Sequence, residues 1–334
     1  MPRWTGLHNF FNDAETKVRK VVGIQAIAVF GQLSQSVGNI VSHYPDIIPL
    51  VVLGLLLIAV GMLAYELFKE SPHAIALYIL VLILSLLWFF NSTQFKERVL
   101  FFDPFFSSLV HLLFLFILSG FIFYLAPKQS RELGFLIYGL AFASPTFRET
   151  VKSLDRDFFA LLFFVIALSL VMNFSFTPKT FRAILETFLL SVFTVVTIGL
   201  NVYASIILPA FIIAFPKRHR RNYVYIGLTI IGIIIFSKVF GISISTKLFD
   251  KSSFYILARF IKESLVQLVL LCYLFVTNFK IAIRMRGQVL FLLILTIAYL
   301  PLLTVHPWLF ASLIVIVSTL SIRLTHKLYL VTQT

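Results

Sequence analysis

The chain has 334 residues, of which 60% are hydrophobic and only 13% are charged, whereas soluble domains carry about 25% charged residues. A soluble core of this length cannot cover so much apolar surface, so the composition predicts that lipid solvates much of the chain. The net charge of +14 does not indicate nucleic-acid binding, because the basic residues fall in short gaps between apolar runs. The single cysteine, Cys272, excludes an intramolecular disulfide and a cysteine-based metal site, and we expect no cofactor.

Residues 1–46 precede the first full apolar run. Within them, residues 9–42 have apolar side chains at three- or four-residue steps: Val22, Ala26, Val29, Leu33, Val37 and Ile40. A helix with one apolar face lies along a membrane surface or packs on a partner. We therefore predict that 9–42 form an amphipathic helix at the cytoplasmic face, where a protein partner can dock.

Ten apolar stretches follow, and each is a candidate membrane-spanning helix, since a span needs about 20 apolar residues. They cover residues 47–67, 74–91, 105–126, 132–147, 158–176, 185–215, 222–241, 256–279, 288–304 and 307–323. The predicted fold class is therefore all-α, a polytopic integral membrane protein with a transmembrane helical domain over 47–323 and a cytoplasmic tail over 324–334. The gaps are too short for a soluble catalytic domain.

The topology depends on the stretch 185–215, which contains Gly199, Asn201 and Pro209. As one kinked span it places both termini in the cytoplasm, with 18 of the 28 Lys and Arg residues inside and 10 outside. Split into two spans, it gives 14 on each side. Because cytoplasmic segments carry an excess of Lys and Arg, we predict the single kinked span, in the inner or plasma membrane of the cell.

A cluster of basic residues follows that stretch: Lys217, Arg218, Arg220 and Arg221, with His219 among them. Next to two apolar runs, such a cluster is typical of a topology anchor. Each basic side chain near anionic lipid head groups contributes about 1 kcal/mol. We predict that the cluster lies at the cytoplasmic face and binds anionic head groups.

One charged pattern occurs twice, as Arg182 with Glu186 and as Arg259 with Glu263. Residues four apart share a helix face, so each pair is expected to interact, and we place both pairs at the outer ends of their spans. Charges within spans often mark substrate or ion routes, and here a glutamate would titrate while its arginine switches partner. The alternative is two interfacial pairs whose side chains extend to the head groups.

Three other residues are candidates for the same pathway. Lys238 follows an apolar run and can neutralise an anionic group or extend to the interface. His111 lies deeper and can relay protons or simply bond a neighbouring helix. Asn201 interrupts the sixth stretch, and broken helices often frame transporter sites.

Enzyme signatures are mostly absent, so an enzyme is the less favoured reading. Asp155 and Asp157 lie at a predicted cytoplasmic boundary, where membrane transferases bind diphosphate through aspartate clusters. Arg98 followed by His111 resembles the Arg…His pair of membrane acyltransferases, which opens the chain in that family but follows two predicted spans here.

We therefore expect a secondary carrier or permease for a small solute or a lipid-linked compound. Two alternatives remain open. One is a non-transporting membrane subunit of a larger secretion, conjugation or respiratory assembly. The other is a membrane-embedded transferase acting on lipid-linked substrates.

Overall fold

The computed structural model describes residues 47–67, 69–91, 102–127, 129–152, 156–173, 181–215, 220–240, 253–284, 287–303 and 307–333. Throughout these ranges the regular elements are helices and there are no strands, which confirms the all-α class. The predicted helix 9–42, and Lys217 and Arg218 of the basic cluster, lie outside the described residues.

The α-helices are α2 (Ile47–Leu67), α3 (Pro72–Asn91), α5 (Phe102–Tyr124), α6 (Gly134–Ala143), α7 (Pro145–Lys152), α8 (Arg156–Met172), α9 (Phe181–Leu200), α10 (Ile207–Ala214), α11 (Arg220–Phe240), α12 (Ser253–Glu263), α13 (Leu265–Arg284), α14 (Gln288–Tyr299) and α15 (Pro307–Gln333). Three short 3₁₀ helices connect some of them: η1 (Arg131–Leu133), η2 (Val202–Ile206) and η3 (Leu300–Leu302).

Proline opens three of these helices, at Pro72, Pro145 and Pro307. The first helical position suits proline, because its missing N–H would have no partner inside the helix. At α3 the preceding Ser71 also caps the helix, since its Oγ accepts a hydrogen bond from the Ala74 N–H at 3.2 Å.

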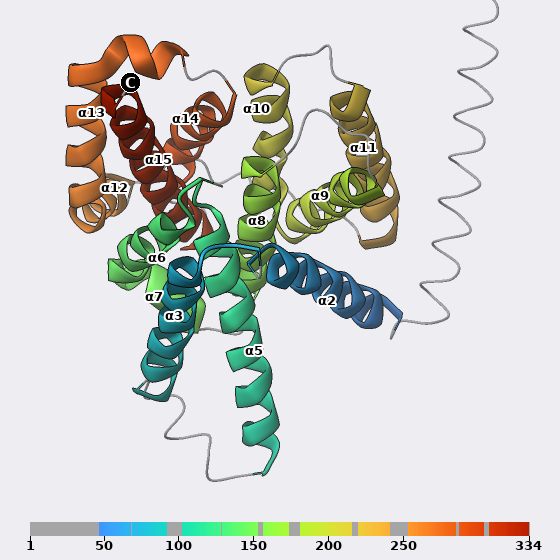
Figure 1. The fold of residues 1–334 in the computed structure, drawn as a ribbon. Helices are drawn as coiled ribbons and strands as arrows, with labels where there is room; N and C mark the ends of the chain where they lie inside the picture. The colour runs from blue at the N-terminus through green and yellow to red at the C-terminus, as the bar shows by residue number, and fades with distance from the viewer. Residues whose placement is uncertain are drawn as a thin grey trace, which may run out of the picture.

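Two helices form the centre of the molecule. Residues Phe158 to Met172 of α8 are nearly all buried, and 94% of the stretch Trp308–Thr325 in α15 is buried inside the protein. Helices α6, α7, α8, α13 and α14 pack around α15. Helices α9 and α11 lie together on one side of this centre, and α12 and α13 lie on the other (Figure 1).

Within the described residues, two helices are long and apolar enough to cross a membrane, Pro72–Phe90 and Trp308–Thr325. The first has many apolar side chains on the protein surface, with Leu87 59% exposed. The second is mostly buried, and the core helix of a soluble protein can be equally long and apolar. A membrane location is thus supported in part, and the number of crossings belongs to the proposal below.

The predicted single span 185–215 is wrong, because α9 ends at Leu200 and the chain turns at Asn201 into η2 and then α10. Helix α9 runs antiparallel to α8, and its last residue, Leu200, accepts a hydrogen bond from Arg156 Nε at 2.6 Å. Since Arg156 is the first residue of α8, Leu200 lies at the start of α8.

The following helix, α10, leads to the opposite end of α8. The Phe215 ring, directly after α10, lies against Gly287, whose φ of 97° suits glycine. The next residue, Gln288, donates a hydrogen bond from Nε2 to the carbonyl of Met172, the last residue of α8. Since α8 is about 25 Å long, the chain reverses direction at Asn201 and traverses the bundle twice.

Candidate functional site

Arg131 is a charged side chain with only 1% exposure, in the turn between α5 and α6. Its Nη1 donates to the carbonyls of Tyr124 (2.9 Å) and Ala126 (2.6 Å), and its Nη2 donates to Asn173 Oδ1 (2.9 Å). Its Nε forms an ion pair with Glu70 Oε1 at 3.3 Å. The guanidinium also lies 4.1 Å from the centroid of the Tyr124 ring, so a cation–π contact adds to the hydrogen bonds.

Asn173 fixes this arrangement from the end of α8. Its Nδ2 donates to the carbonyls of Tyr124 (3.0 Å) and Ser169 (2.8 Å), which leaves Oδ1 directed at Arg131. The amide thus joins α8 to the end of α5.

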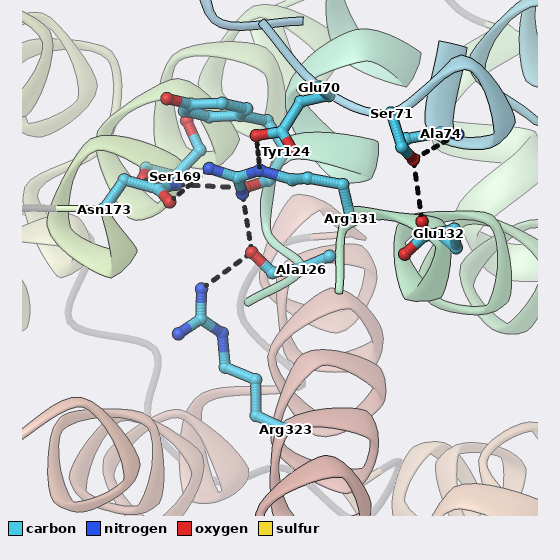
Figure 2. Close-up of polar contacts among 10 residues, drawn as sticks. All are labelled: Glu70, Ser71, Ala74, Tyr124, Ala126, Arg131, Glu132, Ser169, Asn173 and Arg323. Atoms are coloured by element: carbon cyan, nitrogen blue, oxygen red, sulfur yellow. Dashed lines mark hydrogen bonds and ion pairs between the residues drawn. The ribbon is translucent and has the colours of Figure 1, made fainter. Parts of the chain in front are cut away.

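A second buried arginine, Arg323 of α15, reaches the same turn from the other side. Its Nε donates to the Leu125 carbonyl (2.8 Å), its Nη2 to the Ala126 carbonyl (3.2 Å) and its Nη1 to Gln288 Oε1 (2.6 Å). Figure 2 shows both guanidinium groups directed at the Ala126 oxygen. We call Arg131, Arg323 and their partners the arginine centre, and the end of the bundle that contains it the arginine end.

The last carbonyls of a helix have no partner within it and carry the negative end of the helix dipole. The two arginines supply donors to such carbonyls at the end of α5. The charges themselves are not balanced, however. Among the described residues, Arg131 pairs with one carboxylate, Glu70, while all three hydrogen bonds of Arg323 go to neutral acceptors. Within the described residues the arginine centre therefore has an excess of positive charge.

A different charged cluster lies around Glu263, at the end of α12. Arg259 Nε bonds Glu263 Oε1 at 2.8 Å, which confirms that this predicted pair shares a helix face. Arg259 Nη2 also pairs with Glu149 at 3.0 Å. The helix predicted over 256–279 is divided at Ser264, so this cluster lies ahead of the apolar helix α13.

Glu263 also receives three hydrogen bonds from the start of α7. Ser144 Oγ (2.5 Å) and the Thr146 N–H (3.0 Å) donate to Oε2, and Thr146 Oγ1 (2.8 Å) donates to Oε1. Burial raises the pKa of the Glu263 carboxyl, but the hydrogen bonds from Ser144, Arg259 and Thr146 outweigh it, so the pKa lies below its ordinary value. We call this cluster the glutamate site, and the junction of α12 with the start of α7 that contains it the glutamate end.

The two predicted pairs do not meet. Glu186 lies in the first turns of α9, and α9 runs antiparallel to α8 from the arginine end to Leu200. Glu263 lies beside the start of α7, and the expectation that both pairs occupy one side of the membrane stays a prediction.

His111 is 5% exposed and its Nε2 lies 2.8 Å from the carbonyl of Val151, near the end of α7. The rings of Phe89 and Phe158 pack edge-on against it, with centroids at 5.3 Å and 5.6 Å. This is the bond to a neighbouring helix that the sequence analysis offered as the alternative to a proton relay.

Asn201 has a local role, because its Oδ1 accepts a hydrogen bond from the Tyr203 N–H at 3.1 Å and caps η2. Lys238 lies near the end of α11. Asp155 lies outside the described residues. The described residues contain no cluster of three or more His, Cys, Asp or Glu side chains that could hold a metal.

Sequence reasoning missed the arginine centre. In the predicted topology Arg131 is one basic residue in the gap between two spans, and Arg323 is the last residue of the last span. A signal for Arg323 was present, since it follows a long apolar run and is itself followed by Leu324. A charge inside a span is costly and is a functional candidate by default. Nothing in the sequence linked it to Arg131, which is 192 residues earlier.

No family model, curated protein or solved structure matches this chain.

Proposed function

We propose that the protein is a multi-pass membrane carrier for a small anionic solute or an anionic lipid-linked compound. The observation that supports this is Arg323, which is 7% exposed and whose hydrogen bonds to the described residues all go to neutral acceptors. A buried charge without a counter-ion is costly, and an intramembrane cation is a functional candidate. An anionic substrate would supply the missing charge.

Transport by purified, full-length protein in liposomes tests this proposal. We would apply a panel of small anions, including phosphate and mono- and dicarboxylates, and measure charge movement on a solid-supported membrane. Arg323→Gln is the test variant, and Arg323→Lys is the matched control that retains the charge. Loss of a hydrogen bond to a charged group, about 1.5–3 kcal/mol, predicts at least about a tenfold loss of apparent affinity in Arg323→Gln.

Two results would contradict the proposal. One is a flux of neutral or cationic solutes that Arg323→Gln leaves unchanged. The other is the absence of any flux from a protein that is purified only with other chains, which would support the alternative of a non-transporting subunit.

The same proposal includes the topology. Because the chain reverses at Asn201, α10 adds a crossing to the predicted ten, and the two termini lie on opposite sides of the membrane. In this arrangement the basic residues divide as 14 and 14, so charge alone does not orient the chain. The basic cluster 217–221 remains our candidate for binding anionic head groups, and the side that it occupies defines the cytoplasmic face.

Single cysteines in a Cys272→Ser background test the reversal. Gln129, Thr325 and Glu149 are exposed, so each can be replaced by cysteine and labelled with a membrane-impermeant maleimide. We expect Gln129→Cys and Thr325→Cys to react from one side and Glu149→Cys from the other. A single kinked span over 185–215 predicts instead that Gln129→Cys and Thr325→Cys react from opposite sides.

Coupling to protons or ions is a separate part of the proposal. Glu186 and Glu263 remain the candidate titrating groups, with Arg182 and Arg259 as their partners. If replacing all four by Gln leaves transport and membrane assembly intact, this coupling scheme is wrong.

A further inference from the structure

Among the buried polar atoms without a hydrogen-bond partner in the described part of the chain, three lie in one region of the interior. They are the Tyr299 hydroxyl, the Trp308 Nε1–H and the Ser312 hydroxyl. All three residues are 0% exposed. Buried polar groups are nearly always hydrogen-bonded, so three such atoms in one region call for a partner.

These side chains lie close together. The Tyr299 and Trp308 rings are 6.2 Å apart between centroids, and the Phe164 ring is 5.9 Å from Tyr299 and 6.0 Å from Trp308. Ser312 is four residues after Trp308 in α15, so the two side chains share one helix face. Phe164, Tyr299 and Trp308 thus form an aromatic cluster, and Ser312 lies on the same face of α15 as Trp308.

The region lies inside the bundle, where all three residues are buried. Phe164 is the middle residue of α8, and Tyr299 ends the short helix α14, directly before the 3₁₀ turn η3. Arg323 is fifteen residues beyond Trp308 in α15, about 22 Å along the helix axis. Helices that end inside a bundle need polar partners for the backbone groups they free, which makes this a suitable place for a bound polar molecule.

We propose that Tyr299, Trp308 and Ser312 form an internal binding site for an uncharged hydroxyl compound, either water or a small alcohol. The indole N–H only donates, so it requires an acceptor oxygen, while the tyrosine and serine hydroxyls can donate or accept. A hydroxyl group satisfies all three. The aromatic rings of Phe164, Tyr299 and Trp308 suit the apolar surface of an alcohol and disfavour a charged ligand.

Hydroxyl deletions in the full-length protein in detergent test the site. Removing an unpartnered buried hydroxyl should leave stability unchanged or raise it, whereas removing one that binds a ligand should lower it. We expect Tyr299→Phe and Ser312→Ala each to lower the melting temperature by about 2 °C. The double variant should lose less than the sum, because both hydroxyls contact the same molecule.

Ser318 provides the matched control, since its hydroxyl is also buried and unpartnered in the described residues but lies on another face of α15. We expect Ser318→Ala to leave the melting temperature unchanged or raise it. A rise or no change in Tyr299→Phe or Ser312→Ala would overturn the proposal. So would an equal fall in Ser318→Ala, because the effect would then belong to any serine of this helix.

Two further measurements sharpen the test, the first by separating water from alcohol and the second by a readout other than stability. With increasing 1,2-propanediol, the melting temperature of the wild type should rise relative to the double variant if an alcohol binds, and in parallel with it if water is the occupant. In a Trp4→Phe, Trp88→Phe background Trp308 is the sole emitter, and its emission should shift to the blue in Ser312→Ala. An unchanged emission spectrum would overturn the site.

Discussion

The arginine end and the glutamate end both place buried charge at a helix terminus, with opposite sign. At the arginine end, Arg131 and Arg323 donate to carbonyls at the C-terminus of α5. At the glutamate end, Glu263 accepts from the Thr146 N–H at the N-terminus of α7. Both arrangements agree with the helix dipole, which favours cations at C-termini and anions at N-termini.

The two ends differ in charge balance and in access to water. Arg259 joins Glu263 to Glu149, and 39% of its side chain is exposed, so the glutamate site is paired internally and solvated. Arg131 and Arg323 are 1% and 7% exposed, and within the described residues Glu70 is the one carboxylate bonded to them. The glutamate site thus pairs its charges internally, whereas the described part of the arginine centre has more positive than negative charge, which is the basis of our proposal of an anionic substrate.

The largest loss of stability is expected from a substitution in the arginine centre. Arg131→Met keeps much of the side-chain volume but removes the donors to Tyr124, Ala126 and Asn173 and leaves Glu70 without its partner. Breaking a buried ion pair lowers stability by about 3–5 kcal/mol, which denaturant unfolding in detergent would measure. A loss below about 1 kcal/mol would show that the centre does not hold α5, α6 and α8 together.

A smaller loss is expected at the glutamate site. Glu263→Gln removes the charge that Arg259, Ser144 and Thr146 stabilise, and a charged hydrogen bond contributes about 1.5–3 kcal/mol. We expect the variant to lose about 2 kcal/mol of unfolding free energy. The control is Glu149→Gln, whose side chain is 68% exposed and whose surface pair contributes less than about 1 kcal/mol. Equal losses in the two variants would contradict the distinction.

The glutamate site also predicts a dependence on pH. The folded pKa of Glu263 lies below the unfolded value, which is about 4.3. Its contribution to stability is therefore fully present above about pH 4.3 and is lost as the pH falls through the folded pKa. The difference in melting temperature between the wild type and Glu263→Gln should shrink over that window, and a constant difference from pH 7 to pH 3 would contradict the assignment.

The smallest loss of stability is expected from a substitution at Asn201, where the chain reverses between α9 and α10. Asn201→Ala removes the side-chain cap from η2, and loss of such a cap lowers stability by about 1 kcal/mol. Asn201→Asp retains an acceptor oxygen and should remain close to the wild type. If alanine and aspartate have the same effect in thermal unfolding, the cap at Tyr203 N–H does not stabilise the reversal.

The sequence predicted several local features correctly. The all-α class follows from long apolar runs, and the pairing of Arg259 with Glu263 follows from four-residue spacing, which places both on one turn of any helix. The prediction failed at 185–215, because the apolar run continues through Asn201 and hydropathy does not register a change of direction.

The amino-acid sequence by itself determined that this chain is helical and apolar, and which neighbouring residues share a helix face, since these depend on composition and on a 3.6-residue period. Only the tertiary structure decided that Arg131 and Arg323 meet at one carbonyl and that Glu263 joins α12 to α7. Such contacts join residues more than a hundred positions apart, and their distance depends on how helices pack and in which direction each one runs. The local periodicity of the sequence predicts neither the packing of the helices nor their direction.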